Sequence, residues 1–207
     1  MMHSKNIKTS GQSLKDAEKV LIMIHGRGAS AEDILRLAPH LHLKDYALMA
    51  PQATNSTWYP FSFLADPKQN EPWLSSALAL LKEMVTEVTD QGVATENIYF
   101  LGFSQGACLS LEFVTRNATR YGGVVALTGG LIGDRIYGDN YSGDFQGTLV
   151  FLSTGDPDPH VPLKRVEESQ GILEKMNAAV KVKVYENRPH TISQDEIDLA
   201  NQLIFKQ

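Results

Sequence analysis

Cysteine, excess positive charge and long apolar runs are all scarce in this sequence. Its one cysteine, Cys108, cannot form an intramolecular disulfide, so the fold does not depend on an oxidising compartment. The 19 basic and 24 acidic residues give a formal net charge of -5, which leaves no surplus of cations for the phosphates of nucleic acid. No apolar run approaches the roughly 18 residues that a membrane-spanning helix needs, and the polar first residues contain no apolar signal segment. We therefore expect a cytoplasmic protein without stable membrane insertion and without a nucleic-acid partner.

Motifs that bind metals or phosphates are also missing. The sequence contains no HExxH pair of histidines for zinc and no glycine-rich phosphate loop, so we expect no metal and no cofactor. What it does have is 207 residues with 43% hydrophobic content, enough to bury one full-sized core. We expect a single domain over residues 1–207, and the oligomeric state stays open, a homodimer included.

Short apolar runs alternate along the chain with segments of helical spacing. The middle four runs are apolar on both faces, as in a parallel sheet covered by helices on both sides, whereas "VKVKVYE" alternates as an exposed edge strand does. Pro72 opens one helical segment, and Ser30 and Ser193 are N-cap candidates for two others. This order predicts an α/β fold with a mostly parallel, doubly wound sheet flanked by helices. The six runs begin at Val20, Tyr46, Asn97, Gly122, Gly147 and Val180.

The stretch "FLGFSQGAC" places Ser104 between Gly102 and Gly106, after a strand candidate and before a helix candidate. This GxSxG context is that of a nucleophile elbow, in which a sharp turn presents the serine hydroxyl at a helix N-terminus. A serine needs a base to take its proton and an acid to orient that base. In α/β-hydrolases the acid and then the histidine follow the serine along the chain.

The residues after the last two strand candidates supply these groups. The loop "GDPDPHVP" offers Asp156 and Asp158, and "NRPHTIS" offers His190. His160 is too near Asp158 in sequence for the two side chains to face each other easily. We predict Ser104 as nucleophile, Asp158 rather than Asp156 as the orienting acid, and His190 as the base.

Acyl transfer also needs hydrogen-bond donors for the oxyanion. The stretch "IHGRGAS" follows the first strand candidate and resembles the glycine-bearing oxyanion motif of esterases, which predicts the main-chain N–H groups of Arg27 and Gln105 as the donors. The side chain of Arg27 is then free for another task. It either braces the loop by a salt bridge to Glu71 or Asp66, or recognises an anionic group on the substrate.

Two long irregular stretches, residues 51–72 and 131–147, follow the ends of predicted strands, where ligands bind in open α/β sheets. The first contains the aromatic stretch "TWYPFSF". We predict that Trp58 and Phe63 line the acyl pocket. The alternative is that the aromatic rings seal the loop against the core.

Taken together, these motifs resemble the phospholipase/carboxylesterase family of α/β-hydrolases, which contains bacterial carboxylesterases and acyl-protein thioesterases. The matching elements are "HGRGAS", "GFSQGA", "LTGGLIG", "GDPDPHVP" and a histidine followed by "IS". The resemblance implies an α/β-hydrolase fold without a cap domain and a serine carboxylesterase that acts on small-molecule esters, with thioesters and lysophospholipids as related substrates. Departures from the family pattern are Ala107, the "ENRPH" loop with Arg188 and Pro189, and Arg27 in "HGRG", which weakens the case for long acyl chains.

Two other functions remain open. A dienelactone-hydrolase-like enzyme commonly uses a cysteine nucleophile, but Cys108 lies four residues past the elbow serine. A non-enzymatic receptor with this fold binds a small molecule and need not keep all three catalytic residues, whereas this sequence has all three in order.

Overall fold

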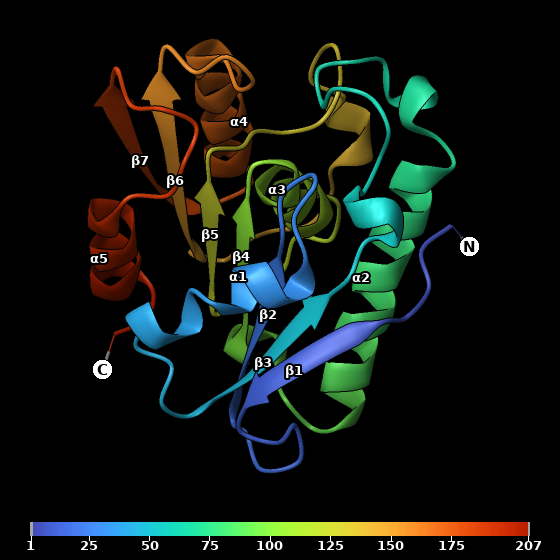
Figure 1. The fold of residues 1–207 in the computed structure, drawn as a ribbon, viewed down its shortest axis with the longest axis vertical. Coiled ribbons are helices and arrows are strands. Elements are labelled where there is room, and N and C mark those ends of the chain that lie inside the picture. The colour runs from blue at the N-terminus through green and yellow to red at the C-terminus, as the bar shows by residue number, and fades with distance from the viewer. Residues whose placement is uncertain (1, 207) are drawn as a thin grey trace.

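The computed structural model describes residues 2–206, which build one seven-stranded sheet with the strand order β1-β3-β2-β4-β5-β6-β7. Only β1 runs antiparallel to its neighbour, and the other six strands are parallel. The strands fan across the molecule in Figure 1. Their bounds are β1 (Ile7–Gly11), β2 (Lys19–Ile24), β3 (Tyr46–Pro51), β4 (Ile98–Phe103), β5 (Gly123–Leu127), β6 (Leu149–Asp156) and β7 (Ala179–Glu186).

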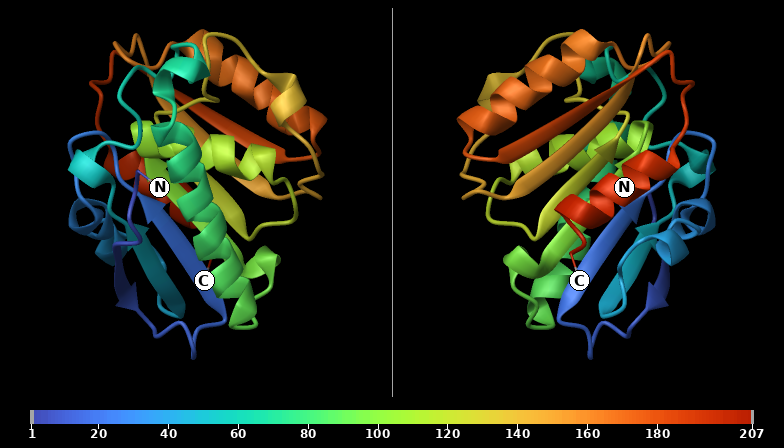
Figure 2. Two further views of the ribbon diagram at one scale, coloured as in Figure 1. Left: turned by 90° about the vertical axis from the view of Figure 1, so that its right-hand side faces the viewer. Right: turned by 90° about the vertical axis from the view of Figure 1, so that its left-hand side faces the viewer.

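Helices cover both faces of the sheet. The core on one face contains buried residues from α2, α3 and α4, and the core on the other contains buried residues from α1 and α5. The two views of Figure 2 look at these two faces in turn. This arrangement confirms the predicted doubly wound α/β fold. The helices are α1 (Ala31–Leu35), α2 (Trp73–Asp90), α3 (Gln105–Arg116), α4 (Leu163–Lys175) and α5 (Gln194–Leu203).

The strand β2 shows why the central strands read as continuous apolar runs. Val20, Ile22 and Ile24 belong to the core on one face, and Leu21 and Met23 belong to the core on the other. A strand that is covered on both faces needs apolar residues at every position. By contrast, β7 lies at the edge of the sheet, and its side chains alternate between exposed and half-buried over most of its length.

The strand β1 is the element that the sequence pattern does not reveal. Its five residues, "IKTSG", are half-buried or exposed and carry no apolar run. They pair with the fully buried β3 through main-chain hydrogen bonds, with Ile7 opposite Pro51 and Gly11 opposite Ala47. Such an edge strand is held by its backbone, so its side chains give no signal of it.

The predicted helix starts are present where serine was expected to cap them. Ser30 and Ser193 each accept a hydrogen bond from the backbone three residues on, and each forms a reciprocal capping box, with Asp33 and Glu196 respectively. Pro72 directly precedes α2, so this helix begins one residue later than the sequence predicts. No helix within residues 2–206 combines the length and apolar character that crossing a bilayer requires.

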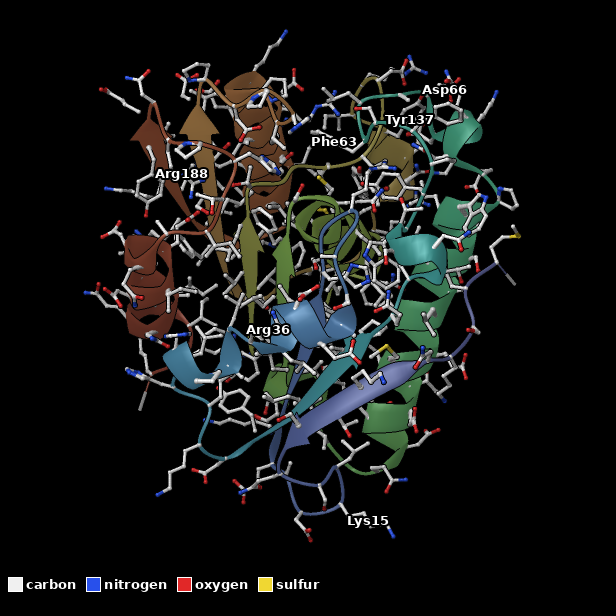
Figure 3. The ribbon with its side chains drawn as sticks, in the orientation of Figure 1. Lys15, Arg36, Phe63, Asp66, Tyr137 and Arg188 are labelled. Atoms are coloured by element: carbon white, nitrogen blue, oxygen red, sulfur yellow. The ribbon has the colours of Figure 1, made fainter. Side chains whose placement is uncertain are left out.

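Both long irregular stretches begin at the carboxyl edge of the parallel strands. They contact each other directly, because the Gly133 N–H donates to the carbonyl oxygen of Phe63 over 2.7 Å. Figure 3 shows Phe63, Asp66 and Tyr137 at this same end of the molecule. The β4 strand ends at the same edge, and the first stretch contributes residues 59–64 to the cavity beside the elbow serine.

Candidate active site

Ser104 stands alone between β4 and α3, in a backbone conformation that serine rarely adopts. Its φ is 53° and its ψ is -118°, and its N–H donates to the carbonyl oxygen of Leu127 in β5 over 3.0 Å. The flanking glycines make this turn possible. A Cβ on Gly102 would lie 2.4 Å from the Gly106 oxygen, and one on Gly106 would lie 2.1 Å from the Ile24 oxygen. Neither position has room for a side chain.

The structure brings Ser104, His190 and Asp158 into one hydrogen-bonded chain. His190 Nε2 lies 2.8 Å from Ser104 Oγ, and His190 Nδ1 lies 2.8 Å from Asp158 Oδ2. The other carboxylate oxygen of Asp158 accepts the N–H groups of His160 and Val161, each over 2.8 Å. Burial opposes ionisation of Asp158, but the hydrogen bonds from His190 and from these two N–H groups lower its pKa below the usual value. The acid next to the imidazole is therefore ionised at neutral pH.

The second aspartate of the loop takes no part in this chain. Asp156 is exposed at the end of β6, and its carbonyl oxygen accepts the Asn187 N–H over 2.8 Å. His160 does not face Asp158 with its ring. Instead, its ring meets the His190 ring edge-on, with centroids 4.9 Å apart.

A buried ion pair, which the sequence pattern does not reveal, holds the backbone just before His190. The Arg188 guanidinium contacts the Glu196 carboxylate, and the two side chains are 9% and 0% exposed. Arg188 also donates to Thr128 Oγ1 over 2.9 Å, and Glu196 accepts from Ser153 Oγ. The pair thus joins the His190 loop to β6, to the residue that follows β5 and to the first turn of α5.

The two predicted oxyanion donors lie beside the serine. Gly26 packs so closely that a Cβ there would be 3.5 Å from Ser104 Cβ, which brings the next residue, Arg27, to the site. Gln105 is the first residue of α3, so its N–H has no partner within the helix. Within residues 2–206 neither the Arg27 N–H nor the Gln105 N–H finds an acceptor. Both donors remain available to a ligand.

The side chain of Gln105 has a role of its own that its main-chain role did not suggest. Its Oε1 accepts the Trp58 N–H over 2.9 Å, and its Nε2 donates to the Tyr59 oxygen over 2.8 Å. The amide therefore fixes the aromatic loop, residues 57–63, to the N-terminus of α3.

The Arg27 side chain braces the same loop, but through different partners than expected. Its guanidinium donates to Thr57 Oγ1, to the Pro60 oxygen and to the Phe61 oxygen over 3.0, 2.9 and 2.7 Å. The expected salt-bridge partners are occupied elsewhere: Glu71 accepts from Ser75 in α2, and Asp66 accepts the Lys68 N–H. Two main-chain oxygens and a hydroxyl replace the expected carboxylate.

A cavity of about 510 Å³ opens beside Ser104 and His190. Phe63 lines it, and so do Tyr59 and the 53% exposed Phe61. Val161 and Leu64 add further apolar surface. The site therefore presents a hydroxyl and an imidazole to a space that is partly apolar, which suits the acyl or alcohol part of a small ester.

Trp58 does not line this cavity, contrary to the expectation from the sequence. It is fully buried, and its indole Nε1 donates to the His25 oxygen over 2.9 Å. Its ring packs between those of His3 and His25, with centroids 5.4 and 5.0 Å away. The alternative reading, in which the aromatic loop is sealed to the core, is the correct one for this residue.

Cys108 borders the cavity from the first turns of α3 but is only 1% exposed. Burial raises the pKa of its thiol to about 12, so the thiol is protonated at neutral pH. A cysteine-based mechanism of the dienelactone-hydrolase kind has no reactive thiolate here.

Comparison with known proteins points to one family. The sequence model of the phospholipase/carboxylesterase family matches residues 9–206. A crystal structure of a phospholipase/carboxylesterase from Dyadobacter fermentans is 58% identical with a TM-score of 0.98, over 100% of this chain and 99% of that one. Acyl-protein thioesterase 1 of Saccharomyces cerevisiae is 29% identical over 212 residues, which cover 91% of this chain and 92% of the thioesterase.

A more distant structure, the carboxylesterase of Bacillus cereus, shares the fold at 23% identity with a TM-score of 0.78, over 96% of this chain and 92% of that one. The family match extends over nearly all of the chain. This protein belongs to the phospholipase/carboxylesterase family of α/β-hydrolases.

Proposed function

We propose that the protein is a serine carboxylesterase that hydrolyses carboxylic esters through an acyl-enzyme on Ser104. The observation that carries the proposal is the hydrogen-bonded chain from Ser104 through His190 to Asp158, with both distances at 2.8 Å. The chain ends at a hydroxyl that the elbow holds next to a cavity. A nucleophile, a base and an orienting acid in hydrogen-bond contact are what nucleophilic acyl transfer needs.

In the first half of the reaction, Ser104 Oγ attacks the ester carbonyl while His190 Nε2 takes the serine proton. The Nδ1–H of His190 donates a hydrogen bond to Asp158, which leaves Nε2 without a proton and free to act as the base. The carbonyl oxygen becomes an oxyanion that the main-chain N–H groups of Arg27 and Gln105 stabilise. Each such donor contributes about 2.7–4 kcal/mol to the transition state. His190 then protonates the leaving alcohol as the C–O bond breaks.

In the second half, water takes the place of the alcohol. His190 removes a proton from the water, and the resulting hydroxide attacks the acyl-enzyme carbonyl. The acyl–Oγ bond breaks, and Ser104 recovers its proton from His190. A thioester follows the same steps with a thiol as leaving group, so thioesters are the second substrate class that we propose, followed by lysophospholipids.

A non-enzymatic receptor is a less favoured function for this site. A receptor needs the cavity but gains nothing from a serine held at a φ of 53°, a conformation that L-amino acids adopt at a cost of about 1–2 kcal/mol. A strained backbone that holds a hydroxyl beside a base supports a catalytic function over a receptor function.

The test is covalent labelling of the purified protein with a fluorophosphonate probe, combined with turnover of p-nitrophenyl acetate. Ser104→Ala is expected to abolish labelling and to lower turnover by about 10³-fold or more while the protein stays folded. Ser110→Ala is the matched control, because Ser110 is a fully buried serine in α3 whose hydroxyl donates to the Gly106 oxygen over 2.8 Å. Substantial turnover by folded Ser104→Ala would refute the proposal.

A further inference from the structure

The cavity beside Ser104 has an unusual balance of charge for a protein with a net charge of -5. Among the described residues that line it, the groups able to carry a positive charge are Arg27, His160 and His190, and none is an aspartate or glutamate. Tyr59 and Cys108 also line it, but burial raises the pKa of both well above neutral pH. The nearest catalytic carboxylate, Asp158, is buried behind His190 and already accepts three hydrogen bonds.

Arg27 keeps both its charge and part of its hydrogen-bonding capacity. A guanidinium has five N–H donors, and the three contacts with Thr57, Pro60 and Phe61 use only Nη1 and Nη2. The Nε–H has no acceptor in residues 2–206, and no carboxylate of that range lies within 4.0 Å of the group. The loop oxygens thus hold the guanidinium in place without neutralising it.

His160 contributes a second donor from a different loop. Its main chain is fixed by the hydrogen bond to Asp158, whereas its ring is exposed and neither ring nitrogen has a partner within the described part of the chain. The ring lies edge-on to that of His190 and so stands directly next to the reacting groups. Two loops that hold the triad and the oxyanion donors therefore also present free N–H groups to the same cavity.

From these contacts we infer that the enzyme acts on esters that bear a carboxylate, which the Arg27 guanidinium binds with His160 as a neighbouring donor. The inference rests on the proposed esterase function and names its substrate class. A planar guanidinium with free donors matches a carboxylate better than any neutral group. Because Arg27 is exposed, water screens the pairing, and the effect is a preference among esters rather than a requirement.

The experiment compares two esters of the same size that differ in charge, 4-acetoxybenzoate and 4-acetoxybenzamide. Both give the same acetyl-enzyme, so the comparison isolates recognition of the alcohol part. A second pair, the p-nitrophenyl half-ester of glutarate and its terminal amide, tests the acyl part. Arg27→Met is expected to lower the anionic-to-neutral ratio of kcat/KM about 5–20-fold in at least one pair, mainly through KM, since the lost contact is a hydrogen bond to a charged group near solvent.

Three comparisons make the result specific. Arg27→Lys keeps the charge and is expected to retain part of the ratio, while His160→Gln lowers it by a smaller factor. Arg36→Met removes the same charge at the end of α1 (Figure 3), where the side chain is 80% exposed. Arg36 does not line the cavity, so this variant is expected to leave the ratio unchanged.

The inference fails on its own if the wild-type protein labels with the fluorophosphonate probe and hydrolyses the neutral esters, yet Arg27→Met lowers kcat/KM for charged and neutral esters equally. That result would leave Arg27 as a brace of the aromatic loop alone. If instead the wild-type protein neither labels nor hydrolyses any ester of the two pairs, the proposed function fails first.

Discussion

Trp58 and Phe63 belong to the same aromatic loop but have different surroundings. Trp58 is fully buried and packs against His3 and His25, and its main-chain N–H is held by Gln105. Phe63 is 7% exposed and lines the cavity. Composition cannot separate these roles, because both rings are large and apolar. The two rings differ in position because of hydrogen bonds that form only in the folded protein, such as those of Trp58 to Gln105 and to the His25 oxygen.

Truncating each ring should therefore have a different effect. Trp58→Ala leaves a void in a closed part of the core and is expected to lower the free energy of unfolding by about 3–5 kcal/mol. Any loss of kcat/KM should then be uniform over p-nitrophenyl esters from two to sixteen carbons. Phe63→Ala is expected to change the ratio of kcat/KM between short and long esters. Urea unfolding and the ester series measure both effects, and a chain-length effect confined to Trp58→Ala would contradict this assignment.

At the level of elements, the connection from β7 to α5 depends on Arg188 and Glu196. Figure 3 shows Arg188 beside β7 and above α5. Its main-chain oxygen also approaches Gly155 in β6 so closely that a Cβ there would lie 2.8 Å away. His190 follows two residues later, so the ion pair sets where the base stands relative to Ser104.

Removing the Arg188 guanidinium should lower kcat more than it changes KM. Arg188→Met is expected to lower kcat about tenfold or more with KM little changed, since a displaced base loses its alignment with the serine. Arg188→Lys keeps a charge for Glu196 and covers the case in which the methionine variant does not fold. Arg116→Met, which breaks the other ion pair to a buried glutamate, Glu112, is the control. Equal effects on kcat at both sites, after correction for the folded fraction, would contradict a positioning role.

The sequence predicts those elements and residues whose signal is local. Buried parallel strands need apolar residues at every position, and a GxSxG turn needs its two glycines. Both features can therefore be recognised from the sequence alone. The strand β1 cannot, because it is held by main-chain pairing with β3. The role of Arg188 cannot be recognised from the sequence either, because its partners, Thr128 and Glu196, come together with it only in the folded protein. The capping role of Glu196 was predictable from Ser193, but its pairing with Arg188 was not.

For the molecule as a whole, two buried histidines tie the aromatic loop and the first described residues to the sheet. The His3 ring lies between the Trp58 oxygen and the Thr54 N–H, and the His25 ring lies between the Gly26 oxygen and the Ala53 N–H. Each ring thus donates through one nitrogen and accepts through the other, which only a neutral imidazole can do. Burial lowers the pKa of both histidines below the usual value.

This arrangement predicts a loss of stability in mild acid. Since the folded pKa values are lowered, the unfolded chain binds more protons than the folded one once the pH falls below about 6.5. The stability that the two neutral rings contribute is fully present above that pH. It is lost as the pH falls from there through the pKa values of the rings in the folded state, by up to about 1.4 kcal/mol per pH unit for each ring. Urea unfolding as a function of pH measures it.

His3→Gln retains a donor and an acceptor without a titrating group, so its stability is expected to depend less on pH than that of the wild type. His40→Gln, at an exposed histidine, is the control. Tryptophan fluorescence follows the same region, because both tryptophans lie against His3, with centroids 5.4 Å away in each case. An unchanged pH dependence in His3→Gln would show that other groups cause the acid sensitivity.

The positive φ of Ser104 has a consequence for the evolution of the fold. A residue without a Cβ relaxes at this position, so Ser104→Gly is expected to melt about 2 °C or more above the equally inactive Ser104→Ala, even though glycine also frees the unfolded chain by about 0.4–1 kcal/mol. Calorimetry on the two variants measures the difference. If it is found, selection for stability alone would favour a glycine here, and the serine persists only as long as its hydroxyl is used.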